Sequence, residues 1–292
     1  MTEITLTEQV NAVVAQLSQD IKNNKLEIPS PPDLLIEIRR LSADQNTTAK
    51  DIAELVKHDI NISGRLIKIA NCSLFGSRAQ VETVQAAITR LGQKKVQSLI
   101  TGLIIGQQFM QSKTRGLESF CEQAWQTSNN VAAMSYVLAK EKSKIDPEQA
   151  LLAGMVHNIG VLPIILKLNK VQALKDNPKI MTLVANVVIP KLYSSAGRLI
   201  MTNWNFPPEI VNVATNHRQL KRESSDMIDL SDLVLIAHQL NQLDSYQDSE
   251  HISEELTESS SFQKFWKQSN DAAENLSELS ETIEQMKHDI TH

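Results

Sequence analysis

The residues best suited to chemistry in this sequence surround a histidine in the run GMVHNIGVLP, residues 154–163. An imidazole nitrogen is a good ligand for a divalent metal ion, and a metal-bound water becomes a nucleophile near neutral pH. A hydrolytic site of this kind also needs carboxylate oxygens around the ion. Here His157 is followed by Asn158, whose amide oxygen is neutral. The doublet therefore offers the histidine ligand of a metal site but not the carboxylate ligand.

Other histidines offer two interpretations of the same chemistry. His217 and His238 can converge with His157 as a three-histidine zinc site, or all three can be hydrogen-bonded histidines packed between helices. His58 and Asp59 also form a histidine–aspartate doublet, but it lies at a predicted helix end, and we expect a surface turn. The sequence has no GxSxG motif and no Gly-rich phosphate loop, which leaves serine hydrolysis and that type of nucleotide binding unsupported.

Charge is distributed unevenly along the 292 residues, whose net charge is −5. Residues 241–292 hold 12 acidic and 3 basic side chains, a net of −9, so the first 240 residues carry +4. Lys94 and Lys95 form the densest basic spot inside the body, and two lysines are more typical of a solvated helix edge than of a phosphate patch. The sequence therefore gives no strong nucleic-acid signal.

Composition and apolar run length indicate a cytoplasmic protein. The start of the chain, MTEITLTEQV, lacks the basic and apolar regions of a secretory signal. The longest apolar runs fall short of the roughly 20 residues that a membrane-spanning helix needs. Cys72 and Cys121 have no CxxC partner and are typical of ordinary cytosolic thiols. We therefore expect no membrane span.

Apolar residues recur at three- and four-residue spacing along most of the chain, and no segment alternates with a period of two. With aromatics at only 4% and few glycines and prolines, this predicts an all-α fold. Asp33 is a plausible cap for the helix at 34–43, and either Thr47 or Thr48 for the helix at 46–59. Gly76 and Gly92 are plausible stops, and 169–178 and 242–260 are expected to be non-helical. The predicted helices cover 5–26, 34–43, 46–59, 60–76, 81–92, 93–109, 117–141, 147–156, 160–168, 179–201, 207–216, 229–241 and 271–290.

Several ordered motifs resemble the HDOD domain, the HD-related output domain of bacterial signalling proteins. The most specific piece is ANCSLFG followed by AITRLG. The other segments are IPSPPDLLIEIRRL, DIAELVKHDINISGRLIKI, GQKKVQSLI, AWQTSNNVAAMS, DPEQALLAGMVHNIGVL and WNFPPEIVNVATNH. The resemblance implies a multi-helix HDOD fold, with an N-terminal helical bundle and a second half related to HD phosphohydrolases.

The resemblance also allows the metal positions of catalytic HD proteins to be carried over one by one. Thr127 matches the first histidine, and His157 and Asn158 match the histidine–aspartate doublet. Tyr193 matches a further histidine of some relatives, and His217 a histidine of the broader group. His238 aligns approximately with the last aspartate. No carboxylate remains among these positions. The resemblance therefore implies no catalytic residue and no divalent metal or other cofactor, with His157, His217 and His238 as the remaining metal candidates.

Two functions remain open from the sequence. The first is a non-catalytic signal-transduction module that binds protein partners and senses a small ligand in the former HD cleft. The second is a metal-dependent phosphohydrolase, acting on nucleotides or cyclic dinucleotides through an atypical ligand set. Trp125 and Trp204 lie in the motif regions, where they either pack in the core or line a small pocket.

The last predicted helix, residues 271–290, is amphipathic. The terminal helix has an a/d-like stripe, which either packs on its own domain or contacts a partner helix; its residues are Leu276, Leu279, Ile283, Met286 and Ile290. We predict that the chain has three divisions: an N-terminal helical extension at 1–19, the HDOD domain at 20–240, and an acidic tail with its terminal amphipathic helix at 241–292. Within the HDOD domain, we expect a bundle at about 20–115 and an HD-like half at 116–240.

Overall fold

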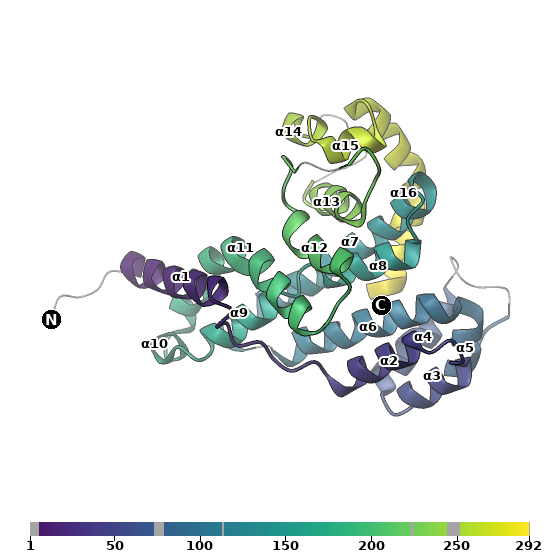
Figure 1. Ribbon diagram of the computed structural model, residues 1–292, viewed down its shortest axis with the longest axis horizontal. Helices are drawn as coiled ribbons and strands as arrows, with labels where there is room; N and C mark the ends of the chain where they lie inside the picture. Colours follow the sequence, from purple (N-terminus) through teal and green to yellow (C-terminus); the bar gives the residue numbers. More distant parts are fainter. Residues whose placement is uncertain (1–5, 73–78, 113, 223–224, 244–251, 292) are drawn as a thin grey trace. The chain divides into compact units, whose positions relative to one another are not determined.

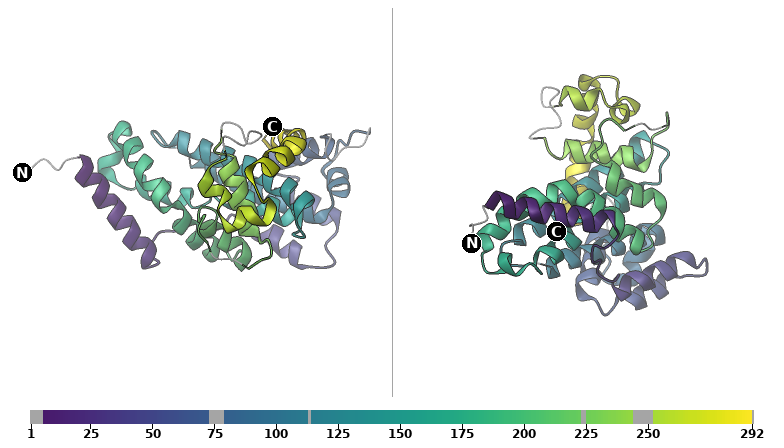
Figure 2. Two further views of the ribbon diagram at one scale, coloured as in Figure 1. Left: turned by 90° about the horizontal axis from the view of Figure 1, so that it is seen from above. Right: turned by 60° about the vertical axis from the view of Figure 1, so that its left-hand side comes forward.

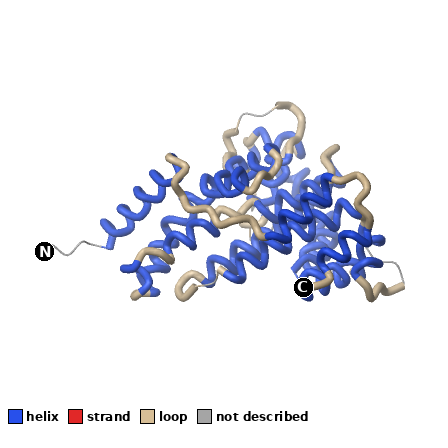
Figure 3. Tube along the Cα trace, turned by 60° about the horizontal axis from the view of Figure 1, so that its bottom comes forward, coloured by secondary structure: helices blue, strands red, loops and turns tan. Residues whose placement is uncertain are grey.

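The structure is a computed structural model that describes residues 6–72, 79–112, 114–222, 225–243 and 252–291. All regular elements within these ranges are helices, as Figure 3 shows. The predicted all-α fold is therefore confirmed. The expected stop at Gly76, with most of the ANCSLFG motif, lies outside the described residues.

The helices follow the predicted periodicity closely. They are α1 (Leu6–Lys22), α2 (Asp33–Ala43), α3 (Ala49–Val56), α4 (Ile60–Asn71), α5 (Val84–Leu91), α6 (Gln93–Gln111), α7 (Glu118–Lys142), α8 (Pro147–Val156), α9 (Val161–Leu168), α10 (Gln172–Lys175), α11 (Pro178–Asn203), α12 (Pro208–Asn216), α13 (Leu230–Leu240), α14 (Glu254–Thr257), α15 (Ser260–Phe265) and α16 (Ser269–Thr291).

The local signals explain most helix boundaries, and three details differ from the prediction. Of the two candidate caps, Thr48 caps α3, in a capping box with Asp51. Asp33 is the first residue of α2, and Pro32 occupies the cap position. The predicted connection at 169–178 contains the one-turn α10, and the predicted loose segment at 242–260 contains α14, which Ser253 caps. Such short helices carry too few apolar positions to show a period.

The chain divides into two compact units, each assembled from separate segments. The first unit comprises the residues up to Ser30, Gly106–Gln126 and His157–Thr215, and the second comprises Pro31–Ile105, Thr127–Val156 and the chain from Asn216 onward. The predicted boundaries at residues 19, 115 and 240 stay predictions.

Helix α11 organises the first unit by packing along both α9 and α1, which lie beside it in Figures 1 and 2. Leu17, Ile164 and Val188 are fully buried in this unit. The indole of Trp204 is also buried, and its Nε1 donates a hydrogen bond of 2.7 Å to the carbonyl of Pro29. This bond ties the segment after α1 to the end of α11, so Trp204 belongs to the core.

The second unit contains two helix clusters, α2–α5 and α8 with α13–α15, and α16 also packs on α4. Between α4 and α5, Asn71 exchanges two hydrogen bonds of 2.8 Å with the backbone of Val81. Arg90 donates to the carbonyls of Ala70 and Ala79. Both side chains come from the most specific family motifs, and here they tie the end of α4 to α5 and to residues 79 and 81.

The terminal helix packs on its own unit with most of the predicted stripe, of which Leu279 is only half-buried. Leu276, Ile283 and Met286 are completely buried. Arg65 of α4 donates a hydrogen bond of 2.6 Å to the carbonyl of Thr291, which is an otherwise unpaired group at a helix end. The apolar face of α16 is therefore occupied by its own chain.

Length and apolar composition alone would let two stretches cross a membrane, namely Pro147–Leu168 and Pro178–Asn203. In the first, 83% of the most apolar window is buried inside the protein, and in the second 44%. Buried core helices pass the same test, so these two stretches are weak evidence for a membrane span.

Candidate functional site

The His157–Asn158 doublet occupies the turn between α8 and α9 in the first unit. Both side chains are buried, His157 completely. The amide nitrogen of Asn158 donates a hydrogen bond of 3.4 Å to the carbonyl of Ala124 in α7, and its own carbonyl accepts from the backbone N–H of Val161. The Asn158 amide thus satisfies a buried carbonyl, a role that an ionised aspartate cannot fill because it has no donor.

Gly160 sets how closely this turn approaches α11. A Cβ atom placed on Gly160 would lie 1.9 Å from the carbonyl oxygen of Tyr193 and 2.3 Å from the backbone nitrogen of Gly197. Tyr193 is itself buried. The structure therefore places the doublet's turn against the Tyr193 backbone, and three of the six candidate positions lie in this part of the first unit.

Restoring the aspartate is expected to destabilise the protein rather than rebuild a metal site. In Asn158→Asp, a buried carboxylate oxygen would face the Ala124 carbonyl in place of an N–H donor, so two acceptors would meet. We expect a loss of about 1–3 kcal/mol in the free energy of unfolding, measured by chemical denaturation. Asn212→Asp, on the exposed side of α12, is the control. Equal stability of the two variants would contradict this role of the amide.

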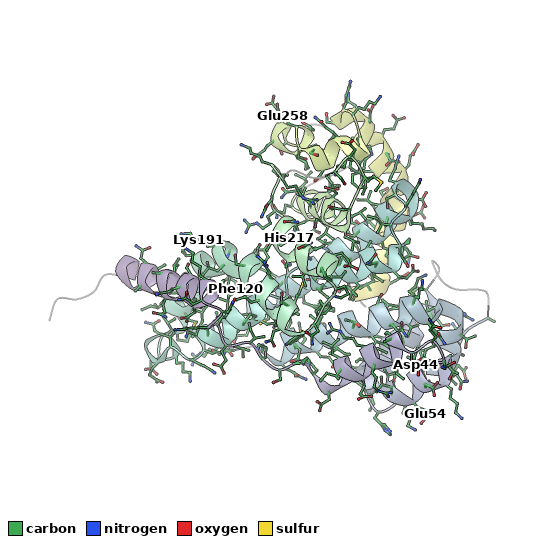
Figure 4. The ribbon with its side chains drawn as sticks, in the orientation of Figure 1. Asp44, Glu54, Phe120, Lys191, His217 and Glu258 are labelled. Atoms are coloured by element: carbon green, nitrogen blue, oxygen red, sulfur yellow. The ribbon has the colours of Figure 1, made fainter. Side chains whose placement is uncertain are left out.

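Thr127, His217 and His238 belong to the second unit. Thr127 is half-buried in α7. His217, which follows α12 and is labelled in Figure 4, is fully buried and meets the ring of His238 edge to face, with ring centroids 5.0 Å apart and planes at 84°. The structure thus brings together two of the three metal candidates, and the three-histidine site stays a prediction.

A hydrogen bond with Gln242 occupies one ring nitrogen of His238. Its Nε2 lies 2.8 Å from the amide nitrogen of Gln242, one helical turn away. Because an amide nitrogen only donates, Nε2 accepts this bond and the proton of a neutral ring is on Nδ1. No carboxylate stands among the matched positions to complete a ligand set around the pair.

A buried charge network anchors the segment that joins the two histidines, and the sequence did not reveal it. Asp232 in α13 is completely buried. It accepts hydrogen bonds of 2.6–2.7 Å from Arg222, Ser261 and Lys264. Arg222 also pairs with Asp229 through both of its terminal nitrogens. The network links α13 and α15 to the chain that follows His217.

The pKa of Asp229 reflects this network. Burial alone would raise the pKa of this carboxyl group, but hydrogen bonds from Arg222 and from the backbone N–H of Asp232 outweigh it, and the pKa lies below its ordinary value. The DxxD spacing of Asp229 and Asp232 could have indicated the capping box that starts α13. Nothing in the spacing of residues along the sequence indicated that Lys264 contacts Asp232.

The remaining sequence candidates have structural roles. Asp59 caps α4 by accepting from the N–H of Ile62, and His58 beside it is exposed, as the surface-turn interpretation requires. Trp125 packs against Phe109 with ring centroids 6.5 Å apart and covers Gly106. Trp125, like Trp204, therefore packs in the core.

The basic spot is partly neutralised within the second unit. Lys94 lies 3.9 Å from Asp146, and Lys95 lies 3.4 Å from Glu148 and over the ring of Tyr136. These contacts lower the positive potential that a phosphate backbone would meet.

Known proteins resemble this chain in sequence and in fold. Residues 28–220 match the family model described as the HDOD domain. A crystal structure from Shewanella amazonensis SB2B, provisionally called a metal-dependent phosphohydrolase, is 23% identical, with a TM-score of 0.76 over 96% of this chain and 97% of that one. An HDOD domain protein of unknown function from Geobacter sulfurreducens is 17% identical, with a TM-score of 0.66 over 96% and 98% of the two chains. At these identities the likeness shows the fold.

Two further relatives have signalling or unassigned descriptions. A structure from Marinobacter aquaeolei VT8, provisionally called a signal transduction protein, is 18% identical, with a TM-score of 0.61 over 99% of this chain and 68% of that one. An uncharacterized protein from Treponema pallidum (strain Nichols) is 23% identical over 244 residues, which are 79% of this chain and 45% of that protein. The chain thus spans about half the length of this curated relative.

Proposed function

This chain belongs to the HDOD domain family, and we propose that it is a non-catalytic regulatory module of bacterial signal transduction that acts in the cytoplasm by binding a protein partner. The observation that carries the proposal is the donor set at the matched HD positions. Asn158 replaces the bridging carboxylate with an amide that donates to a backbone carbonyl. Without an anion to hold and bridge metal ions, the fold keeps its scaffold but lacks the means to activate water.

The alternative function is metal-dependent phosphohydrolysis, which the description of the Shewanella relative favours. The two functions predict different metal contents for the purified protein. We expect protein purified without chelator to contain Fe, Mn and Zn well below one ion per chain, as measured by elemental analysis. His157→Ala and His238→Ala should leave that content unchanged, as should His58→Ala, a variant of an exposed histidine. A stoichiometric metal that either of the first two variants loses and the control keeps would overturn the metal-free proposal and favour the phosphohydrolase.

The partner surface that we propose is the exposed face of α16. Glu274, Glu278 and Glu281 are exposed and follow one another at four- and three-residue spacing, which places them on one side of the helix. The opposite, apolar side is buried in the second unit. A negative, solvated stripe on a well-packed helix favours a partner with a basic docking surface.

Deleting the tail is a poor test of this surface, because it would expose the core that Phe262, Leu276 and Ile283 help to fill. Neutralising the stripe avoids this problem. In a pull-down with purified bait, Glu274→Gln/Glu278→Gln/Glu281→Gln should lose partners that the unmodified chain captures. The matched control neutralises three acids of the α2–α3 region: Glu37→Gln/Asp44→Asn/Glu54→Gln. Asp44 and Glu54 are exposed and labelled in Figure 4, and Glu37 is half-buried. Capture that the tail variant retains would exclude α16 as the partner surface.

A further inference from the structure

The first unit contains an open groove of about 700 Å³ that none of the matched HD positions lines. One wall is formed by the end of α1 and the segment after it, and the other by α11, with Thr215 of α12 at one side. The described lining residues are Ile21, Lys22, Asn24, Leu26, Ile28, Ser195, Arg198, Leu199, Thr202, Asn203 and Thr215. The size falls within the range of small-molecule sites.

Both ends of the α1 wall are held by hydrogen bonds. At one end, Asn24 adopts the left-handed conformation with φ 53°, and the backbone N–H groups of Lys25 and Leu26 both donate to the carbonyl of Asp20. At the other end, Trp204 donates to the carbonyl of Pro29. The wall is therefore formed before any ligand arrives, which lowers the cost of ordering it on binding.

The groove carries positive charge that its acidic neighbours do not neutralise. Lys22 and Arg198 line it and are exposed, and none of its described lining residues is acidic. Asp20 and Glu27 lie on the same α1 segment, but Asp20 pairs with Lys167 at 3.0 Å and Glu27 with Lys170. Hydrogen bonds from these lysines hold the pKa values of both carboxyl groups below their ordinary range. The two carboxylates are therefore paired with Lys167 and Lys170 rather than with Lys22 or Arg198.

We propose that this groove binds a small organic anion, with a phosphate or carboxylate group on an apolar or ring-shaped body. Arg198 and Lys22 would bind the anionic group, and a guanidinium can hold either anion through two parallel hydrogen bonds. Ile21, Leu26 and Leu199 provide apolar surface for the body. The hydroxyl and amide groups of Ser195, Thr202 and Asn203 add donors and acceptors that would orient it.

Calorimetric titration of the full chain tests the site with four probes. AMP carries a phosphate on a ring system, octanoate carries a carboxylate on an apolar chain, and inorganic phosphate and adenosine each supply only half of the proposed chemistry. We expect AMP or octanoate to bind more tightly than both half-probes, and which of the two binds identifies the anionic group. A chain that binds neither AMP nor octanoate at millimolar concentration overturns the proposal.

Variants locate the binding. Arg198→Gln should weaken binding of the preferred probe roughly tenfold, and Lys22→Gln should weaken it as well. Lys191→Gln, seven residues before Arg198 on the same helix and labelled in Figure 4, should leave affinity unchanged because Lys191 does not line the groove. Equal losses in Arg198→Gln and Lys191→Gln would show non-specific charge attraction and overturn the site. Arg198-dependent binding of an oligoglutamate peptide, with none of the small anions, would assign the groove to an acidic peptide instead.

Discussion

Replacing Gly160 by alanine is expected to destabilise the first unit by about 3 kcal/mol, the upper part of the range for overpacked helix contacts. The new methyl group would lie 1.9 Å from the Tyr193 carbonyl oxygen and 2.3 Å from the Gly197 nitrogen. Both obstacles are backbone atoms of α11, so no side chain can rotate away. Helix α9 and the His157 turn would have to move as a body. Thermal and urea denaturation, followed by circular dichroism, measure the loss.

Gly64→Ala is the matched control for this prediction. Gly64 is also helical, and a Cβ atom placed there meets nothing within 4 Å. Because alanine is a better helix former than glycine, this variant should gain up to about 1 kcal/mol. Opposite signs in the two variants would establish that packing against α11 requires glycine at position 160. A Gly160→Ala protein as stable as the parent would refute the close contact.

Replacing Asp232 by alanine is expected to cost about 3–5 kcal/mol, the range for removing one partner of a buried ion pair. The substitution removes the acceptor that Arg222, Ser261 and Lys264 share, and the side chains of both cations are only 8% exposed. It also removes half of the capping box that starts α13. Asp226→Ala, at an exposed position nearby, should change stability by less than about 0.5 kcal/mol.

A double-mutant cycle separates the charge effect from the lost cap. Lys264→Met removes the buried ammonium that Asp232→Ala leaves without its carboxylate. The double variant should therefore be more stable than the sum of the two single losses predicts. Strict additivity would show that the lysine and the aspartate act independently. Since the network links α13 to the chain after His217, we also expect Asp232→Ala to shift the NMR signals of the His217 and His238 rings.

These predictions rest on contacts that differ in how readily a sequence reveals them. The helices were predictable because apolar periodicity and caps such as Thr48 act over a few residues. The missing carboxylates were equally visible, because Asn158 stands directly after His157. The turn-forming role of the His58–Asp59 doublet also followed from its place at a helix end.

Contacts between distant residues could not be predicted from spacing. Lys264 reaches Asp232 across 32 positions, and Asn158 reaches Ala124 across 34. Gly160 gave no sign that it meets a helix backbone, since a glycine near a helix end has several uses. The Asp33 cap was misplaced for a related reason, because the cap position is decided by backbone angles that the sequence only biases.

The sequence by itself determined an all-helical chain, the order of its HDOD motifs and a set of HD positions without carboxylates. Only the tertiary structure decided that His217 faces His238 with Gln242 beside it, that Asp232 collects two buried cations, and that the two walls of the groove meet with Lys22 and Arg198 unneutralised. The physical reason is that helices follow from interactions within a turn or two, whereas the chemistry of a site depends on which helix faces pack together.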